Sequence, residues 1–374
     1  MWLRFRKASS SVCCFALLVV SHPSASQELK SSLEYNKQTA FTIFSGRSNK
    51  LAGYANGGYL AYHMNIGRGA EVKRLAISSI AIALDYKDLR KVHRIETSNF
   101  EPFNRSYSLT AAPAFSLIDF KGLRLIFSPG LGFCYVNEKG YPDKHPILRS
   151  PINFASTAAL KLIYKIAPDA HFVSGADIVH VSNAATRVPN NGLNIVGFNM
   201  GIVKYFATRK TKQLHFLSND VDSAFAKHYF EVGFLAGVRG MYYSKKWLYR
   251  SSVYAGYTYH FASYLGLTTG LDGVYYYSVF DVDNHSSTYQ AKASSFARWR
   301  LGTEIGPSLY MGRLTIKPTY GRYLYYKSYL PIRAYWTMGF AYRVSNWAAI
   351  KAKLYVHEEE VDFLGLGFEF NWSL

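Results

Sequence analysis

The feature that most constrains this chain is an alternation of apolar and polar residues with a period of two, repeated along most of its length. In 152–165 the even positions are mostly apolar, whereas the odd positions include Asn153, Lys161 and Lys165. The same alternation occurs in 349–357 and in 364–372. Successive side chains of a β-strand leave opposite faces, so each such strand has one apolar and one polar face. The pattern therefore predicts an all-β protein.

The composition narrows the class further. Aromatic residues make up 17% of the chain and charged residues 18%, which is too apolar and aromatic for a disordered chain. No run of about 18 apolar residues follows the N-terminal segment, so no membrane-spanning helix is expected. The formal net charge is +19, but the basic residues are spread along the chain rather than clustered in one motif, and nucleic acid is not an expected partner. A soluble β-sandwich and a membrane β-barrel remain.

The N-terminus indicates secretion. Three basic residues lie within the first seven, 12–20 form a short apolar run, and small residues follow at 24–26. This layout is typical of a signal peptide, here 1–26, that is cleaved during secretion. The remaining chain keeps one cysteine, Cys134, and therefore has no disulfide framework.

In a secreted chain, long aromatic strands with an apolar and a polar face favour a transmembrane antiparallel β-barrel of the bacterial outer membrane. The apolar face then meets lipid and the polar face lines the lumen. About fourteen strands are expected, and twelve or sixteen also fit. They are 72–86, 104–119, 121–136, 151–166, 169–182, 193–207, 226–243, 247–264, 265–282, 295–309, 311–326, 332–343, 347–357 and 361–373.

An even number of strands places both ends of the barrel in the periplasm. Residues 72–374 are then the barrel, and 27–71, which alternate poorly, form an N-terminal periplasmic or plug-like segment. Short connections such as 166–168 and 344–346 face the periplasm. Long ones, at 87–103, 137–150, 183–192 and 283–294, face outward. The basic connection 208–225 does not fit this sorting.

Three polar side chains are expected to cluster on the lipid-facing wall. His180 and Ser182 lie two residues apart on one strand, so both leave the same face, and parity places that face towards lipid. Asn194, on the next strand, shares that orientation. Polar groups facing hydrocarbon are costly, and this favours a functional site near the outer rim.

The chemistry that these residues suit is nucleophilic catalysis. His180 is the candidate base, Ser182 the nucleophile and Asn194 the group that orients the imidazole. The side-chain amide of Asn183 and the backbone N–H of Ala184 are candidate donors to an oxyanion. The alternative is that these residues have no catalytic role and form an ordinary turn at a barrel rim.

The segment His-x-Ser-Asn-Ala at 180–184, followed by Pro-Asn-x-Gly at 189–192 and a strand ending in Lys204-Tyr205-Phe206, resembles the PagL-type lipid A 3-O-deacylases. The resemblance covers about 100–207. It implies an outer-membrane barrel hydrolase in which His180 is the base, Ser182 the nucleophile, and Asn183 with Ala184 the oxyanion hole.

The chain departs from those enzymes in two ways. Asn194 stands where they have a Glu, and a neutral amide cannot supply the negative charge of that carboxylate. The chain is also longer than the eight-stranded enzymes. In its length it resembles the outer-membrane proteins called acyloxyacyl hydrolases in Bacteroidetes.

The resemblance implies a deacylase that cuts an acyl ester of lipid A or lipopolysaccharide with no metal or cofactor. Arg149 and Arg187, in outer loops, are candidate contacts to the phosphates of lipid A. The alternative is a catalytically weak or inactive structural or pore-forming barrel. The sequence leaves the acyl position and the oligomeric state open.

Overall fold

A computed structural model of the 374-residue chain describes residues 31–45, 49–64, 76–94, 103–137, 147–206, 226–241, 246–279, 297–327, 332–357 and 360–373. No helix in these ranges is long and apolar enough to cross a membrane. All regular structure in them is β-strand. The strands are β1 (Ser32–Ser45), β2 (Asn49–Ala52), β3 (Ala55–Met64), β4 (Ile77–Asp88), β5 (His93–Arg94), β6 (Arg105–Phe120), β7 (Leu123–Asn137), β8 (Ile152–Lys165), β9 (Ala170–Ser182), β10 (Leu193–Tyr205), β11 (His228–Gly240), β12 (Trp247–Ala262), β13 (Leu265–Tyr276), β14 (Trp299–Met311), β15 (Leu314–Tyr325), β16 (Ala334–Arg343), β17 (Ala348–His357) and β18 (Glu360–Ser373).

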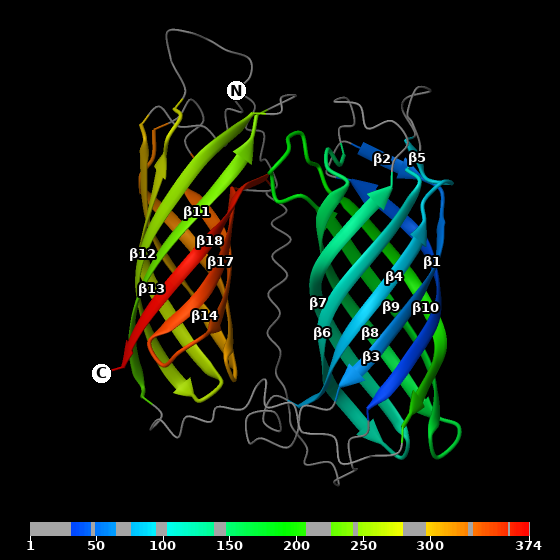
Figure 1. The fold of residues 1–374 in the computed structure, drawn as a ribbon. Helices are drawn as coiled ribbons and strands as arrows, with labels where there is room; N and C mark the ends of the chain where they lie inside the picture. Colours follow the sequence, from blue (N-terminus) through cyan, green and yellow to red (C-terminus); the bar gives the residue numbers. More distant parts are fainter. Residues whose placement is uncertain are drawn as a thin grey trace, which may run out of the picture.

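The strands form two closed barrels rather than one (Figure 1). The first barrel contains β1, β3, β4 and β6 to β10, and it closes where β10 pairs antiparallel with β1. The short strands β2 and β5 pair with each other beside it. The second barrel contains β11 to β18 and closes between β11 and β18. In the described residues, closure leaves neither ring of eight strands with an open edge.

The expected all-β membrane-barrel class is confirmed, and each of the fourteen expected strands coincides with a strand of the structure. The expectation for 27–71 was wrong, because 32–64 contribute β1 and β3 to the first barrel. Lys37 and Thr39 on the outward face of β1, and the pair Gly57-Gly58 in β3, blur the alternation there. With β1 available, β10 pairs with it instead of continuing to β11, and sixteen barrel strands divide into two sets of eight.

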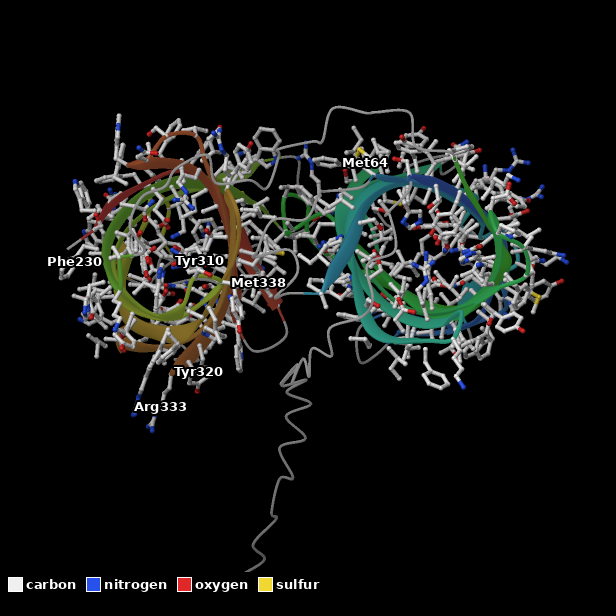
Figure 2. The ribbon with its side chains drawn as sticks, turned by 90° about the horizontal axis from the view of Figure 1, so that it is seen from below. Met64, Phe230, Tyr310, Tyr320, Arg333 and Met338 are labelled. Atoms are coloured by element: carbon white, nitrogen blue, oxygen red, sulfur yellow. The ribbon has the colours of Figure 1, made fainter. Side chains whose placement is uncertain are left out.

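Each barrel has a polar interior and an apolar exterior (Figure 2). In the first lumen, the Nζ of Lys161 lies 2.6 Å from a carboxylate oxygen of Glu34. In the second, the Nζ of Lys353 lies 2.6 Å from Asp272 and 2.9 Å from Glu304. Buried charges of this kind are tolerable only when paired. The outward side chains are mostly large and apolar, as a lipid-facing wall requires.

The strand directions explain the connection that did not fit the loop sorting. The end of β10 pairs with the start of β1, at the same end as the short turn 166–169. We call this the turn end, and the opposite end, which carries 183–192, the outer end. Because β11 starts at the turn end, 208–225 joins the two barrels rather than two strands of one barrel; residues 207–225 lie outside the described ranges.

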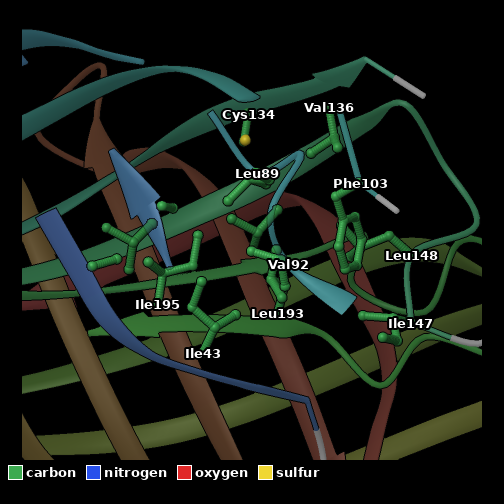
Figure 3. Packing of buried hydrophobic residues seen from close by; sticks show 14 of the residues in the cluster. Ile43, Leu89, Val92, Phe103, Cys134, Val136, Ile147, Leu148, Leu193 and Ile195 are labelled. Atoms are coloured by element: carbon green, nitrogen blue, oxygen red, sulfur yellow. The ribbon is translucent and has the colours of Figure 1, made fainter. Parts of the chain in front are cut away.

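An apolar cluster lies at the outer end of the first barrel (Figure 3). Leu89, Val92 and Phe103 come from one outer connection and Ile147 and Leu148 from another, and all five are buried. They pack against inward-facing residues of β9 and β10, namely Val179, Val181, Leu193 and Ile195. This cluster fixes the ends of the two strands on whose opposite face the candidate site lies.

Candidate active site

His180, Ser182 and Asn194 all lie on the outer wall of the first barrel, near its outer end. On β9, His180 and Ser182 alternate with Val179 and Val181, which are only 3% and 1% exposed and point inward. His180 is the direct partner of Asn194 in the antiparallel pairing of β9 with β10. The fold therefore brings the three side chains to one patch of the lipid-facing wall.

The ring of His180 is oriented by Asn194. The Nδ1 atom of His180 lies 2.8 Å from the Oδ1 atom of Asn194, and the Nδ2 atom of Asn194 donates to the carbonyl of Phe44 at 3.4 Å. An amide oxygen only accepts, so Nδ1 of His180 carries the hydrogen. The Nε2 atom is consequently the one with a free lone pair, which is the tautomer that a general base needs.

Gly192 lies against this imidazole. A Cβ at Gly192 would stand 2.7 Å from Cε1 of His180, and the φ of Gly192 is +68°. Both the close approach and the left-handed backbone favour glycine here. The imidazole of His180 thus has Asn194 at its Nδ1 atom and the backbone of Gly192 against its Cε1 atom.

The hydroxyl of Ser182 accepts from two donors. The Nδ2 atom of Asn190 lies 2.7 Å from its Oγ atom, and the backbone N–H of Ala184 donates to it at 3.4 Å. Since both neighbours donate, the hydrogen of the hydroxyl remains available to a base. Among the described residues, no hydrogen bond joins Ser182 to His180. Their Cα atoms are about 7 Å apart along the strand, a gap that serine and histidine side chains on one face span by small rotations.

The turn after Ser182 has a strained backbone. Ala184 and Ala185 have φ values of 51° and 63°, a region that residues with a Cβ seldom occupy. The Asn183 side chain is buried, and its Oδ1 atom accepts from the backbone N–H of Arg187 at 3.3 Å. Its Nδ2 atom has no hydrogen-bond partner in the described part of the chain. Strain and an unpaired buried amide next to the candidate nucleophile are features that functional turns often carry.

The two candidate phosphate contacts both touch this turn. The Nη1 atom of Arg149 donates to the carbonyl of Val188 at 2.6 Å. The guanidinium of Arg187 lies over the ring of Trp247, 5.1 Å from its centroid. They bring two positive charges to the outer rim beside Ser182.

Sequence reasoning missed Asn190, which contacts the candidate nucleophile directly. Its position in Pro189-Asn-Asn-Gly192 is typical of a turn residue, and nothing in that spacing points back to Ser182 eight residues earlier. Within the described ranges, no group of three His, Cys, Asp or Glu side chains is placed to hold a metal ion.

Together these observations define a class: a lipid-facing membrane β-barrel whose outer wall carries a serine, an oriented histidine and converging hydrogen-bond donors. Residues 32–203 match the family model of the lipid A 3-O-deacylase PagL, and residues 227–372 match the C-terminal domain of the acyloxyacyl hydrolases. The two matches correspond to the two barrels and cover most of the chain. The protein belongs to the PagL and acyloxyacyl hydrolase family, whose members are outer-membrane ester hydrolases acting on lipid A.

The family match begins at residue 32, well before the expected start of the resemblance at about residue 100, because β1 and β3 are part of the first barrel. The longer group of acyloxyacyl hydrolases is confirmed by the match to the second barrel.

No curated protein matches the chain. Solved structures that match include OccK1 (OpdK) of Pseudomonas aeruginosa, with a TM-score of 0.25, 9% identity and coverage of 92% of this chain and 98% of that one. Omp33, an outer membrane protein of Acinetobacter baumannii, matches with a TM-score of 0.16, 8% identity and coverage of 93% and 100%. These scores are too low to transfer anything from those proteins to this chain.

Proposed function

We propose that the protein removes an acyl chain from lipid A by a serine–histidine route on the outer wall of its first barrel. One observation carries the proposal: the imidazole of His180, oriented by Asn194, shares a lipid-facing patch with Ser182, whose oxygen already receives two hydrogen bonds. Ester bonds of lipid A lie just below its headgroup, the height at which an outer-rim site meets them.

The reaction starts with attack of Ser182 Oγ on the ester carbonyl, while Nε2 of His180 accepts the hydroxyl proton. The tetrahedral intermediate carries a negative oxygen next to Oγ. The N–H of Ala184 and the amide of Asn190 already point at Oγ, and a short shift brings them onto that oxygen. His180 then protonates the departing sugar hydroxyl, and water hydrolyses the acyl-serine by the same steps in reverse order.

Asn183 is the second candidate for the oxyanion hole. Its Nδ2 atom is buried and has no hydrogen-bond partner among the described residues, so it is available to donate to an oxyanion. The N–H of Arg187 holds its Oδ1 atom in the resting arrangement. Asn183 and Asn190 are therefore alternative hydrogen-bond donors to the oxyanion. Substituting each one singly shows which of them serves this role.

Arg149 and Arg187 are assigned to the phosphates of the substrate. Guanidinium groups bind phosphate through paired charge-assisted hydrogen bonds, and both residues lie at the outer rim, where headgroups are found. Their contacts with the turn couple headgroup binding to the backbone that follows Ser182.

The test compares lipid A by mass spectrometry from cells that produce the wild type, Ser182→Ala or Ser156→Ala. Ser156 is the control because it is the direct partner of His180 on β8 and carries the same hydroxyl, but it lacks the contacts from Asn190 and Ala184. Loss of one acyl chain is expected with the wild type and Ser156→Ala and not with Ser182→Ala. Unchanged lipid A in all three, with folded protein in the membrane, would remove the proposal.

The second candidate is a barrel with little or no catalytic activity, and Asn194 in place of a carboxylate is the observation that favours it. A pore is less well supported. Among the described residues, ion pairs surround a cavity of only about 30 Å³ in the first lumen, and an apolar cluster lies at its outer end. If Ser182→Ala and wild type give the same lipid A but Asn194→Glu gains deacylation, this second candidate holds.

Export through a cleaved signal peptide also stays a proposal, since residues 1–26 lie outside the described ranges. N-terminal sequencing of the membrane-inserted protein is expected to begin close to residue 27.

A further inference from the structure

The second barrel touches the turn that follows the candidate nucleophile. The backbone N–H of Gly240, the last residue of β11, donates to the carbonyl of Ala185 at 2.7 Å. This hydrogen bond links the two barrels at their outer ends, three residues from Ser182. Figure 1 shows the connection after β9 reaching across towards the second barrel.

Gly240 fits the turn because it has no side chain. A Cβ there would stand 2.8 Å from Cα of Arg187, 2.8 Å from the carbonyl oxygen of Thr186 and 3.0 Å from the N of Val188. All three are backbone atoms, so no side-chain rotation relieves the contact. The approach of the turn to β11 is therefore as close as two backbones allow.

A second contact lies one connection further along the chain. Trp247, the first residue of β12, has its ring 5.1 Å from the guanidinium of Arg187. This is a cation–π arrangement. Trp247 thus holds the side chain of Arg187, whereas Gly240 holds the backbone of the same turn.

The turn needs such support. Ala184 and Ala185 are both in the left-handed region, and a strained backbone persists only where its surroundings fix it. On the first barrel, Thr186 and Arg187 fold back onto Asn183 through hydrogen bonds of 3.1 and 3.3 Å. These contacts are local. The anchor for the carbonyl of Ala185 comes from Gly240, in the other barrel.

From these contacts we infer that the second barrel holds in place the turn that follows Ser182 in the first barrel. Gly240 and Trp247 are the positioning residues. The inference rests on the proposed serine route, because it assigns the anchored turn the task of aiming the N–H of Ala184. It gives the C-terminal barrel a part in catalysis although it contains none of the reacting groups. The strained Ala184 and Ala185 lie between Ser182 and the Ala185 carbonyl that Gly240 anchors. Without that hydrogen bond the backbone of the two alanines is free to rotate, and the N–H of Ala184 turns away from the reacting oxygen.

The experiment measures release of fatty acid from purified lipopolysaccharide by the full-length protein in detergent. Gly240→Ala is compared with Tyr249→Ala, which removes an exposed side chain from the same outward face of β12 as Trp247. Gly240→Ala is expected to lower kcat about 10-fold or more, since one oxyanion donor is worth about 10² to 10³. The pH dependence of kcat should stay unchanged, because the hydrogen bond between His180 and Asn194 is not touched. Tyr249→Ala should match the wild type.

Trp247 supplies a second, independent variant. Trp247→Ala should lower kcat, and Trp247→Phe, which keeps an aromatic face for Arg187, should restore most of it. Heat-dependent migration of the folded barrels on a denaturing gel reports whether each variant is folded. Should Gly240→Ala not fold, the Trp247 pair decides.

The outcomes separate the two proposals. If the wild type is active, Ser182→Ala is inactive, and folded Gly240→Ala and Trp247→Ala keep the full kcat, the serine route stands and the positioning role is wrong. If the wild type and Ser182→Ala release fatty acid equally, the serine route itself has failed. A fall in kcat that tracks a fall in the folded fraction also overturns the positioning role.

Discussion

The Nδ1 atom of His180 and the Oδ1 atom of Asn194 lie 2.8 Å apart across the pairing of β9 with β10. In serine proteases, replacing the triad carboxylate by an amide costs about 10⁴ in turnover, largely because the histidine adopts the wrong tautomer. Here the carbonyl of Phe44 accepts from Nδ2 of Asn194, which turns Oδ1 towards the imidazole. The amide thus preserves the useful tautomer, and what it lacks is only the negative charge.

The first prediction concerns that charge. Asn194→Glu should raise kcat roughly 10-fold or more, because a carboxylate in the same place stabilises the imidazolium formed during attack. Asn194→Leu, which keeps the volume but orients nothing, should lower kcat. Initial rates of fatty acid release measure both. Equal rates for all three forms would show that position 194 does not act on His180.

The second prediction concerns Asn190. Asn190→Ala removes the shorter of the two hydrogen bonds to Ser182 and should lower kcat about 10² with little change in KM. Asn191→Ala, a change at the exposed neighbouring residue of the same turn, is the control. If Asn183→Ala lowers kcat instead and Asn190→Ala does not, the oxyanion is held by Asn183.

The third prediction concerns the space against the imidazole. Gly192→Ala places a methyl group 2.7 Å from Cε1 of His180 and forces alanine into a φ of +68°. The strain should cost about 1 kcal/mol of stability, and displacement of the ring should lower kcat further than the folded fraction explains. Folded protein with wild-type kcat would mean that the ring tolerates the shift.

The fourth prediction separates stability from activity. Glu34 is fully buried in the first lumen and accepts hydrogen bonds from Lys161 and Asn36. Glu34→Met leaves the ammonium of Lys161 without its carboxylate and should destabilise the barrel by about 3–5 kcal/mol, seen as a lower urea midpoint.

The double variant Glu34→Met with Lys161→Met is the matched control. Removing both charges should recover part of the loss, because Lys161 is no longer an unpaired buried charge, whereas Asn36 and His63 still lose the carboxylate they contact. Both variants, where folded, should keep the specific activity, since the lumen lies behind the wall that carries Ser182. A double variant no more stable than Glu34→Met would contradict this account.

Much of this architecture follows from local pattern. The period of two identified fourteen strands, and parity placed His180, Ser182 and Asn194 on one face, because both depend only on neighbouring residues. The division into two barrels does not, since it rests on the pairing of β10 with β1, which lies about 160 positions earlier in the chain. Lys37 also obscured the alternation of apolar and polar residues in β1, because it is an outward-facing cation on a wall that is otherwise mostly apolar.

The site was predictable to the same extent. Strand parity brings the imidazole next to Asn194, but the contact of Asn190 with Ser182 depends on how a ten-residue connection folds back. The hydrogen bond from Gly240 depends in addition on where a second closed sheet lies, and no spacing in the sequence encodes that.

The apolar cluster at the outer end of the first barrel also bears on where the products of the proposed reaction would travel. Among the described residues this cluster lies behind the wall that carries Ser182, so in the proposed reaction the freed fatty acid and the shortened lipid would both leave sideways into the leaflet from which the substrate came. The proposed reaction would therefore need no passage through the lumen of the first barrel.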